Sequence, residues 1–160
     1  MMNEETKARL GPALGKIPSG LYITTAADAG RPLGMLSSFI EQAGFEPPML
    51  SMAVAGERPI RRVIEQSGRF GVNILAKSSS AVMKPFARND IAEPFAGLEL
   101  RENAHGLPQL DAAMAFLACR LRGQLDAGDH VLMLGEVVDG EIHDPNAEPM
   151  VRIRANGFAY

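Results

Sequence analysis

A single cysteine, Cys119, is present in the 160 residues, so an intramolecular disulfide is excluded. Long apolar runs are also missing, because the longest, residues 112–119, falls short of the roughly 18 residues that a membrane span needs. Basic residues are not in excess: Lys and Arg total 16 against 19 Asp and Glu, a net charge of −3. A nucleic-acid-binding face needs the opposite balance. We therefore expect neither a nucleic acid nor a membrane as partner.

Most motifs of well-known enzyme chemistry are absent as well. No GxGxxG follows a strand pattern and no P-loop is present, which argues against a Rossmann dinucleotide site or a P-loop nucleotide site. His105, His130 and His143 lack the spacing of metal ligands, and there is no HExxH. No GxSxG surrounds any serine. The sequence gives no support for hydrolytic or metal chemistry, and we predict no metal site.

Length and composition predict one domain over residues 1–160. A chain of this size fits a single core, and 46% of its residues are hydrophobic. No repeat, linker or low-complexity tract divides it. Residues 1–10 are charged and polar and lack the apolar region of a signal peptide, which predicts a cytoplasmic protein.

Segments rich in β-forming residues recur along most of the chain. Strands are predicted over residues 21–26, 35–40, 49–55, 70–75, 115–125, 130–142 and 151–154. The remaining patterns predict a helix over residues 4–17 interrupted near Gly11-Pro12, a short helix over 79–87, a turn over 41–48 and a loop-rich stretch over 89–108. Strands in this number, with helices between only some of them, favour an antiparallel barrel over a parallel α/β sheet.

One helix is predicted more sharply than the others, over residues 59–67. Ile60, Val63 and Ile64 fall at i, i+3 and i+4, and the charged residues take the other face. Pro59 stands at the first helical position, where its missing N–H costs nothing.

The first candidate binding segment is Gly34-Met35-Leu36-Ser37-Ser38-Phe39. Adjacent serines on a strand point to opposite faces, so a hydroxyl can reach a ligand in a groove. Nearby backbone N–H groups can bond a flat heterocycle. The same residues also fit an edge strand with solvated serines, and their spacing leaves both interpretations open.

The second candidate is Ala53-Val54-Ala55-Gly56-Glu57-Arg58-Pro59, where a strand runs into a helix. The start of a helix offers unpaired N–H groups and a partial positive charge, which suit a phosphate. Arg58 can add a charge-assisted hydrogen bond. The alternative is an ordinary loop with a solvated arginine.

Two further residues are candidates on weaker grounds. His130 follows the Gly128-Asp129 turn and opens a strand, so it can lie at a barrel mouth or simply serve the turn. Asn73 lies within the apolar segment GVNIL. A buried asparagine needs hydrogen-bond partners, so it is either a structural link or a ligand contact.

Taken in order, these pieces resemble the flavin reductase-like family with the FMN-binding split-barrel fold. The matching segments are PSGLYITT (18–25), GMLSSF (34–39), Pro47-Pro48, FGVNIL (70–75), GLPQL (106–110), LAC (117–119) and GDH (128–130). The resemblance covers nearly the whole chain, from about Leu14 to Tyr160. The segment EQAGFEPPMLSMAVA (41–55) is most similar to the flavin reductase module of cyanobacterial diflavin flavoproteins.

The resemblance implies a mainly β, antiparallel Greek-key split barrel that is a homodimer with FMN near the subunit interface. FAD is the alternative flavin. The implied cofactor contacts are Gly34, Met35, Leu36, Ser37, Ser38, Phe39, Ala53, Val54 and Ala55, with the phosphate end near Arg58, Pro59 and Ile60, and we add Asn73 to them. His130 is similar to a histidine that faces the nicotinamide in family reductases, so it is the candidate catalytic residue. Many members have Thr-Ala where this chain has Met35-Leu36, and we expect the bulkier Leu36 to narrow the cofactor groove.

The implied activity is NAD(P)H:flavin oxidoreduction, with hydride passing from NAD(P)H to the flavin. The cofactor carries the organic chemistry, so the lack of an acid–base constellation is compatible with it. Implied partners are a flavin, a nicotinamide nucleotide, a second copy of the chain and a downstream electron-acceptor protein. Two alternatives stay open: a flavin-binding electron carrier or sensor that does not oxidise NAD(P)H, and a barrel without cofactor, which Leu36 favours.

Overall fold

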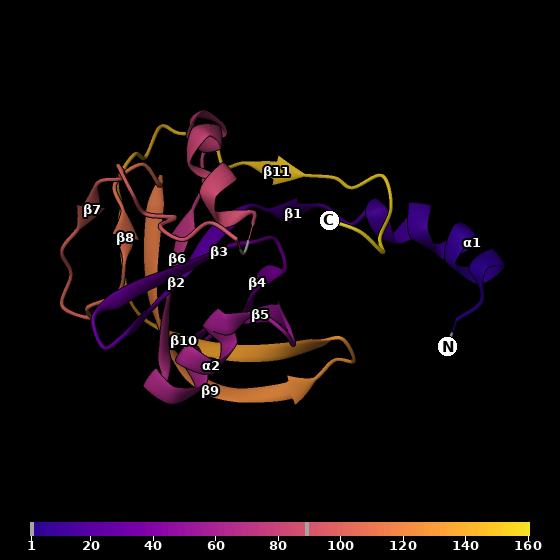
Figure 1. The fold of residues 1–160 in the computed structure, drawn as a ribbon, viewed down its shortest axis with the longest axis horizontal. Helices are drawn as coiled ribbons and strands as arrows, with labels where there is room; N and C mark the ends of the chain where they lie inside the picture. Colours follow the sequence, from indigo (N-terminus) through magenta and orange to yellow (C-terminus); the bar gives the residue numbers. More distant parts are fainter. Residues whose placement is uncertain (1, 89) are drawn as a thin grey trace.

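The computed structural model describes residues 2–88 and 90–160, and its centre is one antiparallel sheet of seven strands. The strand order is β3-β2-β6-β9-β10-β5-β4. Its strands are β2 (Tyr22–Asp28), β3 (Arg31–Ser37), β4 (Ile40–Phe45), β5 (Pro48–Ala55), β6 (Arg69–Ile74), β9 (Ala115–Asp126) and β10 (His130–Ile142). The predicted mainly β, antiparallel fold is confirmed (Figure 1).

The barrel is split between its two edge strands, which are consecutive in the chain. β3 ends at Ser37 and β4 begins at Ile40, so only Ser38 and Phe39 lie between the edges. The backbone N–H of Ala53 donates to the carbonyl of Phe39 at 2.9 Å, which ties this crossing to β5. The predicted strand over residues 35–40 is therefore two strand ends with a crossing between them.

Helix α2 (Pro59–Ser67) covers the main core and has the predicted bounds. Ile60 and Ile64 pack there against residues such as Phe70 and Met133. Gly68 ends the helix in the left-handed region, with φ of 69°, and its N–H donates to the Ile64 carbonyl. Proline at one end and glycine at the other explain why these bounds are readable from sequence.

A second core lies beneath two short 3₁₀ turns, Lys77–Val82 and Lys84–Phe86. Val82 and Phe86 pack there against Leu21 and neighbouring apolar residues. The predicted helix over residues 79–87 is thus a pair of tighter turns. Beyond it, the expected loop-rich stretch carries only β7 (Leu100–Arg101), which pairs with β8 (Gln109–Leu110), and Asn89 lies outside the described residues.

Helix α1 (Glu4–Gly15) projects from one end of the molecule, beside the ribbon of β1 (Ser19–Gly20) and β11 (Val151–Arg152) (Figure 1). The predicted interruption near Gly11-Pro12 is wrong, because the helix continues through Pro12. Proline removes a single intrahelical hydrogen bond there. No helix in the described residues is long and apolar enough to span a membrane.

The turn predicted over residues 41–48 is also wrong, because most of it is strand β4. Ile40 to Phe45 pairs with Pro48 to Met52 of β5 in an antiparallel hairpin. Glu41 and Gln42 are exposed, as expected at a sheet edge, so β4 lacks the apolar alternation that marks a strand in sequence.

Candidate functional site

A pocket of about 350 Å³ lies at the split of the barrel, and we call it the split pocket. It is lined by Leu21, Met35, Leu36, Ser37, Ser38, Phe39, Ala53, Ala55, Arg58, Ala87, Arg152 and Tyr160. Most of the predicted ring-contact residues are therefore brought together here. Val54 is the exception on β5: Ala53 and Ala55 face the pocket, and the alternation of the strand turns Val54 into the main core, where it is fully buried.

The two adjacent serines have different hydrogen-bonding states. Ser37 Oγ lies 2.8 Å from Thr24 Oγ1, so its hydroxyl already has a partner in the protein. Ser38 is only 7% exposed, and within residues 2–88 and 90–160 no hydrogen bond of its hydroxyl is found. No buried side-chain nitrogen or oxygen in the described residues lacks a hydrogen-bond partner, so the Ser38 oxygen is accessible from the pocket that it lines. The pocket is where a partner for Ser38 can enter.

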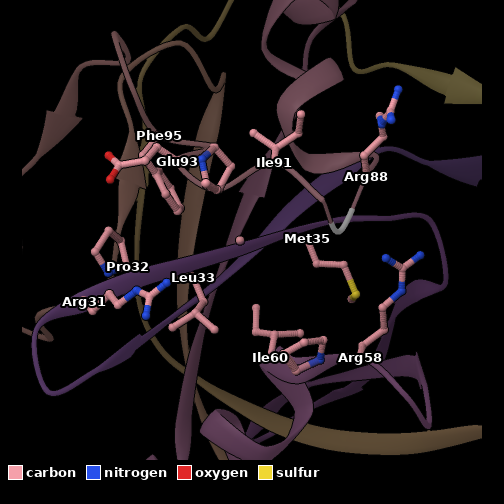
Figure 2. Close-up of a pocket in the computed structure, with 14 residues that line it drawn as sticks. Arg31, Pro32, Leu33, Met35, Arg58, Ile60, Arg88, Ile91, Glu93 and Phe95 are labelled. Carbon is pink, nitrogen blue, oxygen red and sulfur yellow. The ribbon is translucent and has the colours of Figure 1, made fainter.

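A second, larger pocket of about 530 Å³ adjoins the first, and we call it the arginine pocket. It is lined by Arg31, Pro32, Leu33, Gly34, Met35, Arg58, Pro59, Ile60, Arg88, Ile91, Ala92, Glu93, Pro94 and Phe95. Figure 2 shows Arg31 toward one end, Arg58 and Arg88 toward the other, and Met35 between them. Three guanidinium groups and the Glu93 carboxylate line this pocket, and Arg88 is also paired with the Asp90 carboxylate through two hydrogen bonds of 2.9 and 2.6 Å. Arg31 and Arg58 keep the balance of charge in favour of an anion.

Arg58 and the start of α2 are the residues for which the sequence predicts anion binding. Arg58 is the N-cap residue, Pro59 opens the helix, and no side chain caps it in the described part of the chain. Pro59 has no N–H, and the N–H of Arg61 donates to the Arg58 carbonyl at 3.1 Å, which leaves the N–H of Ile60 for an acceptor. Pro59 and Ile60 line the arginine pocket, so this element faces the predicted ligand space.

His130 does not line the split pocket: it pairs in register with Ala55, which does, and its own place is in a third pocket with Gly56 and Arg61. Its side chain is 16% exposed. Nδ1 lies 2.7 Å from Asp129 Oδ1, and Nε2 lies 2.6 Å from the phenol oxygen of Tyr160. The ring is also 5.8 Å from the ring of Phe39. The structure thus places His130 beside the predicted ring-contact segment.

Two titratable groups next to His130 have shifted pKa values. The hydrogen bond and charge of His130 lower the pKa of Asp129. Burial raises the pKa of Tyr160, and the negative charge of Asp129 acts in the same direction, whereas Arg58 and Arg154 oppose it. At neutral pH, Asp129 is therefore an anion that only accepts hydrogen bonds, and Tyr160 is a neutral phenol.

Asn73 lies outside both pockets and is fully buried. Its amide nitrogen donates to the carbonyls of Ile23 and Pro108, and its oxygen accepts from the N–H of Leu110 at 2.7 Å. These bonds join β2, β6 and the strand β8. Of the two interpretations of Asn73, the geometry favours the structural link.

Gly34 lines the arginine pocket, but its lack of a side chain has a packing reason. A Cβ at this position would lie 2.5 Å from the ring of Phe86 and 2.9 Å from that of Phe95. These two rings form an edge-on pair with centroids 4.9 Å apart. Leu36 has a double role: it packs against the second core and also lines the split pocket.

Several lining residues were not found from the sequence. Arg31 lies at a strand start, Arg88 and Phe95 come from the loop after the 3₁₀ turns, and Tyr160 comes from the end of the chain. No local pattern marks them, because only tertiary packing brings them to the pockets. Among the described residues, no group of His, Cys, Asp and Glu is arranged to hold a metal ion.

Comparisons with known proteins give relatives for this site and fold. Diflavin flavoprotein A 1 of Synechocystis sp. is 32% identical over 154 residues, which cover 94% of this chain and 27% of that protein. The chain thus spans about a quarter of the curated relatives that it matches. The crystal structure of a nitrilotriacetate monooxygenase component B homolog from Mycobacterium thermoresistibile has a TM-score of 0.86 at 27% identity, covering 96% of this chain and 86% of that one.

Flavin reductase HpaC, solved in complex with NADP⁺, has a TM-score of 0.80 at 26% identity, covering 95% of this chain and 94% of that one. The family described as "Flavin reductase like domain" matches residues 14–157, nearly the range over which the sequence shows its resemblance. A match over this much of the chain, on the same barrel, identifies it. The chain belongs to the flavin reductase-like domain family.

Proposed function

We propose that this chain binds a flavin across the split pocket and Arg58 and reduces it with NAD(P)H. The observation that carries the proposal is the Ser38 hydroxyl, which has no hydrogen-bond partner in residues 2–88 and 90–160 and is accessible from a pocket that leads to Arg58. A flat polar ring with a phosphate tail fits that pairing of groups. The family supports the choice of a flavin over other ligands.

The chain's own contribution is binding and orientation. A bound flavin supplies a ring that accepts hydride from a nicotinamide, and no protein acid or base is needed for that transfer. Ser38 and the neighbouring backbone amides supply donors to the ring as its negative charge grows. Ser37 holds the strand end in place through Thr24. Arg58 and the start of α2 hold a phosphate.

FMN and FAD differ in what they ask of the arginine pocket. Either flavin uses the split pocket and Arg58. The second phosphate and the adenine of FAD find cations at Arg31 and Arg88 and an apolar wall that includes Phe95. We propose that FMN fills the split pocket and ends at Arg58 and the start of α2, where the two pockets meet, and that FAD extends further into the arginine pocket.

His130 is the proposed nicotinamide contact, because it is partly exposed and contacts Phe39 and Tyr160, which line the split pocket. The related reductase HpaC was crystallised with NADP⁺, which supports a nicotinamide co-substrate. One observation favours the alternative of a flavin carrier that does not use NAD(P)H: Tyr160 occupies the space beside His130 Nε2. A nicotinamide must displace Tyr160 to reach that nitrogen.

A second copy of the chain is the proposed partner of the exposed β1–β11 ribbon. The ribbon of β1 and β11 extends from the barrel toward α1 (Figure 1). On it and next to it in the chain, Ile17, Val151 and Ile153 are 60%, 60% and 62% exposed. Apolar side chains gathered on one extension are typical of a covered surface, and two-fold dimers are the commonest way to cover it. Light scattering tests this: a dimeric mass is expected, and a monomer with flavin bound at full occupancy contradicts it. The cytoplasmic location and the electron-acceptor protein stay predictions.

The test of the proposed function is a titration of the purified protein with FMN and FAD, followed by NADH or NADPH. Binding is expected to perturb the flavin absorbance, and added flavin is expected to make NAD(P)H oxidation catalytic. Flavin binding without NAD(P)H oxidation contradicts the reductase assignment and supports the carrier. Failure to bind either flavin supports the barrel without cofactor.

A further inference from the structure

Residues 154–160, which we call the tail, are seated tightly against α1. The N–H of Arg154 donates to the Gly15 carbonyl at 3.1 Å, and the N–H of Gly157 donates to the Gly11 carbonyl at 2.7 Å. A side chain at Gly157 would overlap with Leu14. The path of the tail is therefore set by close backbone contact with the helix.

The tail delivers Tyr160 to the mouth of the split pocket. Arg154 lies over the Phe39 ring, 4.9 Å from its centroid, and its guanidinium donates to the Gly157 carbonyl at 3.3 Å. The Tyr160 ring lies 5.8 Å from the Phe39 ring, at a tilt of 42°. Tyr160 nevertheless stays 62% exposed, so few contacts besides its hydroxyl hold the ring in place.

When the His130 imidazole is neutral, its contact with Asp129 sets the direction of its contact with Tyr160. Asp129 is an ionised acceptor, so Nδ1 of His130 carries the proton that is shared with it. In the neutral imidazole, Nε2 is then an acceptor. The Tyr160 hydroxyl, 2.6 Å away, is the donor to that lone pair.

A nicotinamide presents the same kind of group at its edge, because the carboxamide N–H₂ is also a neutral donor. We propose that Tyr160 is a placeholder for the nicotinamide: its hydroxyl satisfies His130 Nε2 until the carboxamide replaces it. The proposal rests on the proposed function, since it assigns the nicotinamide to His130. It also explains why a residue that blocks His130 is compatible with a reductase.

A placeholder weakens nucleotide binding without touching the chemical step. The nucleotide binds only to molecules in which Tyr160 has moved away. The apparent dissociation constant is therefore the intrinsic one divided by the fraction of such molecules. One neutral hydrogen bond shifts that fraction by about fivefold. Loss of the hydroxyl should therefore lower the KM for NAD(P)H about fivefold and leave kcat unchanged.

The experiment compares wild type with Tyr160→Phe, which keeps the ring and removes the hydroxyl, and with Tyr160→Ala. Steady-state KM and kcat for NADPH and NADH are measured at saturating flavin. Calorimetric titration with NADP⁺ gives a second readout that does not depend on turnover. The dissociation constant for NADP⁺ is expected to fall by the same factor as KM. Tyr22→Phe removes the other phenol hydroxyl, and Phe158→Ala alters the tail away from His130, so both are matched controls with expected wild-type values.

Two outcomes overturn the proposal, and they are distinguishable. If wild type oxidises NAD(P)H but Tyr160→Phe has an unchanged or higher KM, the placeholder role is wrong and the reductase function stands. If neither wild type nor Tyr160→Ala binds NADP⁺ or oxidises NAD(P)H, the reductase function falls together with it. A KM that falls about fivefold in Tyr160→Phe, with kcat unchanged, supports the placeholder role.

Discussion

Met35 and Arg58 stand where the two pockets meet, and each lines both of them. Met35 lies on β3 and Arg58 directly before α2, so an edge strand of the barrel and a helix start together form the boundary. A ligand that fills the split pocket and extends past this boundary meets a guanidinium group at once. This arrangement underlies the predictions for flavin binding.

Replacing Arg58 tests the phosphate assignment. Arg58→Ala is expected to weaken FMN binding by about 1.5–3 kcal/mol, because a charge-assisted hydrogen bond is lost. This equals roughly a 10- to 150-fold rise in the dissociation constant. Fluorescence titration of FMN measures it. Arg62 is exposed on the same helix, so Arg62→Ala should bind FMN like wild type. An equal loss of FMN affinity in both variants would mean that net charge, and not a contact of Arg58 with the phosphate, causes the loss.

Arg88 separates the two flavins. Arg88 lines only the arginine pocket, so Arg88→Ala should weaken FAD several-fold and leave FMN unchanged. The physical reason is that only FAD carries a second phosphate into that pocket. Parallel titrations with the two flavins give the ratio. If Arg88→Ala has the same ratio of FAD to FMN affinity as wild type, Arg88 does not contact FAD and the proposed use of the arginine pocket is wrong.

His130 is expected to act by positioning the nicotinamide. His130→Ala should slow flavin reduction by on the order of a hundredfold at most, while FMN affinity changes little. Rapid-mixing kinetics and a flavin titration on the same sample provide the two numbers. His105→Ala is the control, because His105 contacts Asp139 far along the sheet from the split pocket. An unchanged rate in His130→Ala removes the role given to that residue alone.

The Asp129–His130 contact gives a pH prediction with a defined sign. His130 lowers the folded-state pKa of Asp129, so the contact favours the folded state above the ordinary carboxyl pKa of 3.8. That contribution is lost as pH falls through the lowered value. Carbon-13 NMR titration of the Asp129 carboxyl should give a midpoint below 3.8 in wild type and a normal one in His130→Ala. A normal midpoint in wild type would mean that the contact is absent in solution.

Gly34 tests whether packing fixes the arginine pocket. In Gly34→Ala the new Cβ meets the Phe86 ring at 2.5 Å, and Phe86 is buried at 2% exposure. Overpacking of this kind costs about 1–3 kcal/mol of folding stability. Urea denaturation measures the loss. Gly123→Ala, which meets nothing within 4 Å, should be close to neutral.

The sequence predicted the elements whose bounds are set by residues within the segment itself. It did not predict those whose structure depends on contacts with other parts of the chain. The bounds of α2 follow from Pro59 and Gly68, which act within the segment itself. Strand β10 begins where the Gly128-Asp129 turn ends, at His130. Strand β4 gave no signal because an edge strand with exposed Glu41 and Gln42 has no buried face to reveal.

The candidate site divides along the same line. The segment from Met35 to Phe39 was found because it is continuous in the chain and belongs to a motif, GMLSSF, that carries the family resemblance; its spacing alone left the choice open. Arg88, Phe95 and Tyr160 were missed because a loop and the tail bring them in through packing that no local pattern encodes. For Asn73, the sequence showed a need for partners, and only the structure showed that Ile23, Pro108 and Leu110 meet it.

The most direct test of the central claim is anaerobic stopped-flow mixing of the flavin-loaded protein with NADH and, separately, NADPH. Hydride transfer bleaches the oxidised flavin band near its absorbance maximum. We predict bleaching with at least one nucleotide, at a rate that saturates with its concentration because the nucleotide must first bind beside His130. No bleaching with either nucleotide, from a protein shown to hold flavin, would contradict the reductase function.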